Sequence, residues 1–227
     1  NLGSTQAKLG KLIEAEASLK NAITFGSDFF AAYNHLGSIQ KDLGRLEEAV
    51  ATYRKALELK PGFMEAHYNL GCALHDLRQL DEARASFETA IALDPNFFEP
   101  HFNLGNLLKE LGRFEDALIA YTKAIELQPG DYNSHSNQGT VLQELGKLNE
   151  AEAAFIRAIS LKPNFAEAHN NLGSVRCMLG NIDAGLKAFR IAEEIDPRVN
   201  NNKFMSIVME ARRKNGWYKA CVGDRKE

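Results

Sequence analysis

The feature that most constrains this sequence is a pattern that returns every 34 residues. Glycine occupies one position of every copy, at Gly3, Gly37, Gly71, Gly105, Gly139 and Gly173. Alanine occupies another, at Ala22, Ala56, Ala90, Ala124, Ala158 and Ala192. A large side chain recurs at Leu19, Tyr53, Phe87, Tyr121, Phe155 and Phe189, and proline closes every copy except the first, where Ser27 stands. A unit of this size cannot bury its apolar residues alone, so the copies must stack on one another.

The copy from residue 98 to residue 129 shows the pattern of a single unit. Leu104, Leu108 and Leu111 recur at helical spacing, and a second helical stripe of Ala117, Tyr121, Ala124 and Ile125 follows. Gly112 separates the two stripes and Pro129 ends the second one. The sequence therefore predicts two amphipathic helices joined by a short turn.

These residues resemble the tetratricopeptide repeat family, which has this period and this arrangement of Gly, Ala, aromatic residues and Pro. The resemblance implies an all-α solenoid, a right-handed superhelix of antiparallel helix pairs. We expect six repeats over residues 1–199: a truncated copy at 1–29, then 30–63, 64–97, 98–131, 132–165 and 166–199. In the first copy a half-helix should precede a helix around residues 12–25. Residues 200–227, with the apolar stripe Phe204, Ile207, Val208 and Ala211, are predicted to form a capping helix and a tail.

One turn departs from the glycine pattern. Arg78 stands where Gly44, Gly112, Gly146 and Gly180 close the first helix of the other copies. Because glycine enters left-handed backbone conformations most easily, we expect a different turn geometry at Arg78.

Composition and charge exclude several classes of protein. A net charge of −3 and a pI near 6.1 give no reason to expect a nucleic-acid partner. No apolar run approaches the roughly 18 residues that a membrane span needs, and no signal peptide leads the sequence, so we expect a cytoplasmic protein. Cys72, Cys177 and Cys221 share no repeat position, which argues against a disulfide framework.

No catalytic or cofactor-binding motif is found, and we predict a protein that is not an enzyme and holds no cofactor or metal. Histidine does recur once per copy, at His67, His101, His135 and His169. Packed helix axes lie about 8–10 Å apart, whereas the ligands of one metal lie within about 2 Å of it. One histidine per copy therefore cannot form a metal cage. The resemblance gives these positions a packing role, because the family often has Trp there.

Asparagine recurs as well, two residues before the glycine, at Asn69, Asn103, Asn137 and Asn171. Asparagine is a poor helix-interior residue, but its amide can donate and accept at once, as a peptide backbone does. The series resembles the asparagine ladder of O-linked N-acetylglucosamine transferase superhelices, which holds extended polypeptide. The resemblance places it on the concave surface, and helical spacing adds Tyr68, Asp76, Phe102, Asn106, Glu110 and Glu144 to the same stripe. The alternative is a ladder whose amides only join neighbouring helices.

The stripe carries acidic residues at Asp42, Asp76, Glu110 and Glu144 against Lys41 and Lys109. We therefore expect a protein or peptide partner that is neutral or basic and extended. The predicted function is a peptide-binding scaffold. One alternative is the substrate-recruiting arm of a larger bacterial glycosyl-, sulfo- or methyltransferase, because the sequence starts inside a helix and its tail is unfinished. Another is self-assembly into a homo-oligomer through the uncapped N-terminal end.

Overall fold

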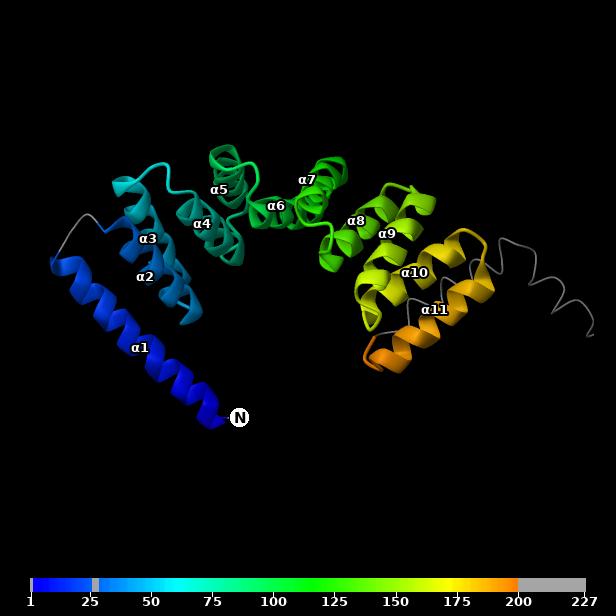
Figure 1. The fold of residues 1–227 in the computed structure, drawn as a ribbon, viewed down its shortest axis with the longest axis horizontal. Helices are drawn as coiled ribbons and strands as arrows, with labels where there is room; N and C mark the ends of the chain where they lie inside the picture. Colours follow the sequence, from blue (N-terminus) through cyan, green and yellow to red (C-terminus); the bar gives the residue numbers. More distant parts are fainter. Residues whose placement is uncertain (1, 26–28, 200–227) are drawn as a thin grey trace, which may run out of the picture. The chain divides into compact units, whose positions relative to one another are not determined.

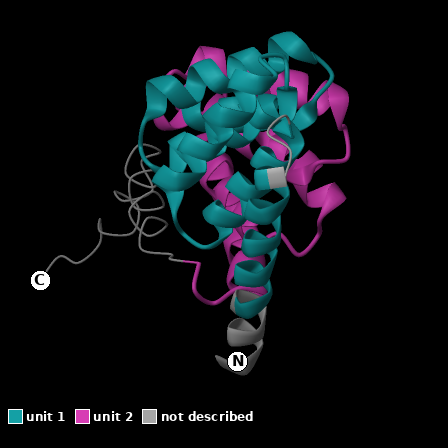
Figure 2. Ribbon diagram, turned by 90° about the vertical axis from the view of Figure 1, so that its left-hand side faces the viewer, with its two compact units in different colours: residues 1–107 teal, residues 108–227 magenta. Residues whose placement is uncertain are grey.

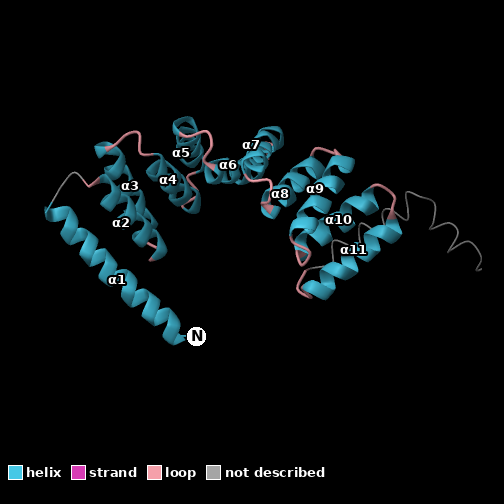
Figure 3. Cartoon of the chain, in the orientation of Figure 1, coloured by secondary structure: helices cyan, strands magenta, loops and turns pink. Residues whose placement is uncertain are grey.

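The computed structural model describes residues 2–25 and 29–199, and these residues form helices, turns and loops without a strand (Figure 3). The predicted capping helix and tail at 200–227 lie outside the described residues. Along the sequence the helices are α1 Leu2–Phe25, α2 Phe30–Asp42, α3 Leu46–Leu59, α4 Met64–Asp76, α5 Leu80–Leu93, α6 Phe98–Glu110, α7 Phe114–Leu127, α8 Tyr132–Glu144, α9 Leu148–Leu161, α10 Ala166–Met178 and α11 Ile182–Ile195 (Figure 1). None of the helices in these ranges is long and apolar enough to cross a lipid bilayer.

The protein divides into two compact units, residues 1–107 and 108–227, with the boundary inside α6 (Figure 2). Within the first unit α2 pairs with α3 and α4 pairs with α5; within the second, α8 pairs with α9 and α10 with α11. We call α2, α4, α6, α8 and α10 the first helices, and α3, α5, α7, α9 and α11 the second helices. These helix pairs confirm the all-α class that the sequence predicts.

The first helices lie closer together than the second helices do within each unit. α2 contacts α4 and α8 contacts α10, whereas in the part of the protein described here α3 does not contact α5 and α9 does not contact α11. Each unit therefore curves locally, with the first helices on its inner side. Residues of the predicted asparagine stripe belong to these first helices.

Each helix pair turns through the same hydrogen-bonded cap. At the end of α2, the N–H of Gly44 donates to the carbonyl of Lys41 and that of Arg45 to the carbonyl of Gln40, both at 2.9 Å. This is the Schellman pattern, which requires a left-handed residue after the helix. The same φ range recurs at Gly44, Gly112, Gly146 and Gly180, with values of 77°, 71°, 72° and 89°.

The expectation of a different turn at Arg78 was wrong. Arg78 has a φ of 63°, and the N–H groups of Arg78 and Gln79 donate to His75 and Leu74 at 2.9 Å, as in the other turns. Packing of the two helices and the two cap hydrogen bonds impose the left-handed conformation on a residue that does not favour it.

The first copy also differs from the expectation. A single continuous helix, α1, covers 24 residues in place of a half-helix, a break and a second helix. Gly10, at the position of the turn glycines, lies inside this helix. The physical reason lies in the sequence: Leu19 replaces the ring that clasps the two helices of the later copies. α1 contacts α2, and its buried Glu16 forms an ion pair with Arg45.

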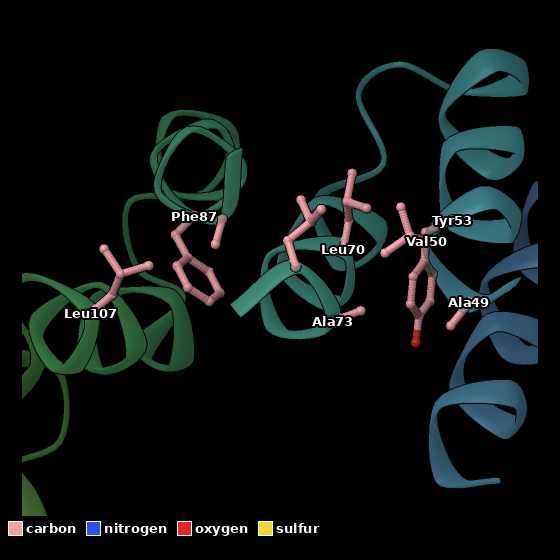
Figure 4. Packing of buried hydrophobic residues seen from close by; sticks show 9 residues of the cluster. Ala49, Val50, Tyr53, Leu70, Ala73, Phe87 and Leu107 are labelled. Atoms are coloured by element: carbon pink, nitrogen blue, oxygen red, sulfur yellow. The ribbon is translucent and has the colours of Figure 1, made fainter. Parts of the chain in front are cut away.

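The core of each unit consists of small residues and rings between the helix layers. In the first unit Ala49, Ala73 and Ala83 are fully buried, and so nearly are Tyr53 and Phe87. Figure 4 shows Tyr53 and Val50 of α3 facing Leu70 of α4, and Phe87 of α5 beside Leu107 of α6. The second unit repeats the arrangement around Phe155, with Leu142, Ala151, Leu172 and Val175. This close packing fixes the inner faces of the first helices.

The joints between successive copies carry a histidine contact. The Nε2 atom of His67 lies 2.8 Å from the carbonyl oxygen of Pro61, six residues earlier. The same contact recurs from His101 to Pro95 at 3.0 Å, from His135 to Pro129 at 3.1 Å and from His169 to Pro163 at 2.9 Å. These His–Pro contacts give the four histidines the structural role that the sequence favoured.

Candidate functional site

The candidate site consists of the recurrent asparagines on the first helices, which we call the asparagine ladder: Asn69 on α4 and Asn103 on α6 in the first unit, and Asn137 on α8 and Asn171 on α10 in the second. All four residues are half-buried. The helical spacing places each amide near the preceding first helix, because the 34-residue period returns each copy to the same face.

In the first unit the ladder amides donate to the preceding copy. Asn69 Nδ2 donates to Asn34 Oδ1 at 3.0 Å, and Asn103 Nδ2 donates to Tyr68 Oη at 3.2 Å. Asn103 Nδ2 also lies 3.6 Å from Cys72 Sγ. Both donors thus contact a residue 35 or 31 positions earlier. These bonds correspond to the alternative in which the ladder joins neighbouring helices.

The same bonds leave part of each amide unused. Among the described residues no group donates to Oδ1 of Asn69 or Asn103, and the side chain of Asn171 forms no hydrogen bond. An asparagine amide can make about four hydrogen bonds in all. The inter-helix bonds therefore orient the amides of Asn69 and Asn103 while their carbonyl oxygens remain acceptors for another group.

In the second unit the ladder is joined by Lys109, which the sequence placed on the stripe as a charge but not as a partner of an asparagine. Lys109, in the last turn of α6, donates from Nζ to Asn137 Oδ1 at 3.0 Å. Burial lowers the pKa of Lys109, and the charge of Glu167 acts in the opposite direction. The only sequence signal for this contact is the spacing of 28 residues, which puts the two residues on neighbouring first helices.

The aromatic residues predicted to flank the ladder are partly occupied by internal contacts. The half-buried Tyr68 ring meets Phe97 at 5.3 Å and Phe87 at 6.2 Å between ring centroids. Burial raises the pKa of Tyr68 and also that of the neighbouring Cys72 thiol. Phe102 stacks on Phe98 at 5.8 Å along the same helix. Neither thiol nor phenol is activated here, so this cluster offers shape and hydrogen bonds without nucleophilic chemistry.

The predicted acidic residues lie at the ends of the first helices. Asp76, Glu110 and Glu144 are all exposed, whereas Asn106 is half-buried. Asp76 forms an ion pair with Lys41 at 3.7 Å. Gln138, which replaces a leucine of the other copies, donates to Thr122 of α7 at 3.1 Å and so has an internal partner. Among the described residues no cluster of three or more His, Cys, Asp or Glu side chains could hold a metal ion.

Comparison with protein families identifies the repeats. A family model described as "TPR repeat" matches residues 39–78 and 139–180. Two models described as "Tetratricopeptide repeat" match residues 68–132 and 120–153. Together the matches extend over residues 39–180. A search of curated protein sequences gave no match.

Comparison with solved structures gives the same fold. One is described as "YrrB: a TPR protein with an unusual peptide-binding site"; it is 25% identical, with a TM-score of 0.73, and the alignment covers 86% of this protein and 97% of that one. A MamA structure is 25% identical with a TM-score of 0.69, covering 72% and 95%. MamA from Desulfovibrio magneticus RS-1 is 20% identical with a TM-score of 0.70, covering 75% and 97%. The last likeness concerns the fold alone.

Proposed function

The protein has tetratricopeptide repeats from residue 39 to residue 180, and on this basis we propose that it is a protein-binding scaffold that holds an extended polypeptide along its asparagine ladder. The observation that carries the proposal is the half-used state of the ladder. Asn69 and Asn103 are held by bonds to the preceding helix, while their Oδ1 atoms accept nothing from the described residues.

A polypeptide backbone has the groups that such a ladder lacks. Its N–H groups can donate to the asparagine Oδ1 atoms, and an extended peptide advances about 3.3 Å per residue. Packed helices lie about 8–10 Å apart, so neighbouring rungs would meet the ligand at roughly every third residue or more. Each bond contributes about 0.5–1.5 kcal/mol net. Several rungs together give weak binding that tolerates many sequences, and the solved relative YrrB, described as having a peptide-binding site, supports this type of ligand.

The charge beside the ladder favours a neutral or basic segment. Asp76, Glu110 and Glu144 are exposed at the ends of α4, α6 and α8. Acidic residues around a binding stripe attract basic partners and disfavour acidic ones. Tyr68 and Phe102 add half-buried aromatic surface next to the amides. These residues are the proposed source of any preference among bound sequences.

The test replaces Asn69, Asn103 and Asn137 together with alanine. The probe is an immobilised array of random dodecapeptides with blocked ends, and the control carries alanine at three exposed asparagines outside the ladder, Asn96, Asn149 and Asn164. We expect the ladder variant to lose about fivefold or more in affinity, because the unused Oδ1 acceptors of Asn69 and Asn103 are removed and each bond contributes at least about 0.5 kcal/mol. Asn137 Oδ1 already accepts from Lys109, so its replacement adds to the loss only through the lysine. The control should bind as the wild type does.

Stability separates the two roles of the ladder. If the triple variant unfolds at a lower temperature but binds the array with unchanged affinity, the amides only join helices and the proposal is wrong. Alanine, the replacement, is the best helix former, so the variant should keep its helices. A loss of affinity without loss of helical content would therefore come from the missing amides.

A further inference from the structure

The half-buried Lys109 has no acidic partner within the described residues. Its Nζ makes one hydrogen bond, to the neutral Asn137 Oδ1 at 3.0 Å, and no carboxylate of the described residues lies within ion-pair distance. An ammonium group carries three N–H donors. A charged group that is removed from water usually has a charged or fully hydrogen-bonded partner, because its desolvation is costly.

A second lysine shows what this position does elsewhere in the protein. Lys41 stands two 34-residue periods before Lys109 and pairs with Asp76 at 3.7 Å. The residue equivalent to Asp76 in the later copy is Glu144, which is exposed and forms no ion pair with any described residue. Lys109 thus bonds to the ladder amide and does not form the ion pair that Lys41 forms in the earlier copy. The two lysines occupy equivalent positions, but Lys41 has a carboxylate partner within the protein and Lys109 has only a neutral amide.

No carboxylate of the described residues forms an ion pair with Lys109, and Glu167 is the acidic residue whose charge acts on it. Asn137 on α8 is neutral, and Glu167 on α10 acts on the lysine only through its charge. The half-buried amine and the amide come from two neighbouring first helices, so the amine lies beside a rung of the asparagine ladder. An unmodified polypeptide has one kind of anionic group near neutral pH, the carboxylate.

We propose that Lys109, positioned by Asn137, binds a carboxylate of the polypeptide held on the asparagine ladder. The inference rests on the proposed function and adds a fixed anchor to it: the segment is neutral or basic in general but carries one carboxylate at this rung. An aspartate or glutamate side chain and the C-terminus of a polypeptide have the same chemistry. The ammonium would form a charge-assisted hydrogen bond to either one.

The test uses three pools of dodecapeptides with acetylated N-termini and without other acidic residues. One pool has Glu fixed at the centre and an amidated C-terminus, one has Gln there and an amidated C-terminus, and one has Gln there and a free C-terminal carboxylate. The proteins are the wild type, Lys109→Met and, as control, Lys123→Met, which removes an exposed lysine on the second helix α7. Methionine retains most of the lysine stem, so the packing of α6 is preserved.

We expect the wild type to bind the Glu pool or the free-carboxylate pool about tenfold more tightly than the amidated Gln pool. The pool that gains identifies the source of the carboxylate. Lys109→Met should lose this preference and still bind the amidated Gln pool, whereas Lys123→Met should keep it. A preference that is absent in the wild type, or that survives in Lys109→Met, would overturn the proposal.

A spectroscopic measurement covers the case in which Lys109→Met does not fold. In wild-type protein with ¹³C-labelled lysine, the pKa of Lys109 should rise on addition of the preferred pool and stay unchanged on addition of the amidated Gln pool. If all pools bind equally and binding is lost in the ladder variant, the scaffold function stands and the carboxylate anchor is wrong. If no pool binds the wild type, the proposed function fails and the anchor fails with it.

Discussion

The ring of Phe87 on α5 fills the space beside Gly71 on α4 so closely that a β-carbon on the glycine would stand 2.7 Å from the ring atoms Cδ1 and Cε1. The same relationship joins Gly37 to Tyr53, Gly139 to Phe155 and Gly173 to Phe189. The residues are 16 positions apart in every case. In each of these four helix pairs a ring on the second helix therefore lies directly on the backbone of the first helix.

Replacing Gly71 with alanine should destabilise the protein. Phe87 is only 1% exposed and lies in the core, so it cannot swing out to make room. Overpacking of this kind costs about 1–3 kcal/mol, and the better helix propensity of alanine returns up to about 1 kcal/mol. We expect a net loss of about 1–2 kcal/mol in urea unfolding followed by circular dichroism.

Gly10→Ala is the matched control, because Gly10 also lies inside a helix and a β-carbon there would meet nothing within 4 Å. It should be neutral or stabilising by up to about 1 kcal/mol. Similar effects of the two substitutions would show that the ring contact does not limit the Gly71 position.

Arg78→Gly should stabilise the turn between α4 and α5. Arg78 has a φ of 63°, a conformation that costs an L-residue about 1–2 kcal/mol and glycine little. Part of the gain is offset by the greater freedom of glycine in the unfolded state, so we expect a net gain of about 0.5–1 kcal/mol. The reciprocal change, Gly112→Arg, should lower the free energy of unfolding by a similar amount. A loss of stability in Arg78→Gly would mean that the contacts of the arginine contribute more than its backbone conformation costs.

Stability should fall at alkaline pH partly because of Tyr53. Burial raises the pKa of Tyr53 from 10.0 to about 12, although its hydrogen bond to Ser38 acts in the opposite direction. The unfolded protein releases this proton near pH 10 while the native protein holds it until about pH 12. The contribution is thus complete below pH 10 and is lost as the pH rises toward 12, at about 1 kcal/mol per pH unit.

Tyr53→Phe should make the pH dependence of the unfolding free energy shallower between about pH 10 and 12, as measured by chemical denaturation at several pH values. Ser38→Ala is the control, since it removes the 3.2 Å hydrogen bond and leaves the buried phenol in place. An identical slope in wild type and Tyr53→Phe would show that Tyr53 titrates alike in both states.

The sequence predicted the fold class because the fold depends on residues that recur. Small residues and rings such as Gly71 and Phe87 hold fixed places in each copy, and their spacing alone requires helices that pair and stack. The prediction was wrong where a single residue departs from the pattern. Arg78 adopts the conformation of glycine because two cap hydrogen bonds impose it. Leu19, inside the continuous helix α1, lacks the ring that holds two helices together in the later copies.

The candidate site could be predicted only in part. Periodicity placed the asparagines together on the first helices, but it could not give their partners, which depend on side-chain reach. Asn69 and Asn103 meet different groups, an amide and a phenol, at the same offset of about one copy. Periodicity placed Lys109 on the stripe, but it could not predict the bond to Asn137, because a flexible lysine stem can reach several neighbouring groups.

Each His–Pro contact joins two residues that are only six positions apart in the sequence. Each of the four joints that carry this contact therefore contains both of its residues, and neither residue belongs to a distant copy. Duplicating or deleting one whole 34-residue copy would therefore add or remove one His–Pro contact and leave the contacts at the other joints intact. Binding surfaces of different length can accordingly be built from this architecture by changing the number of copies.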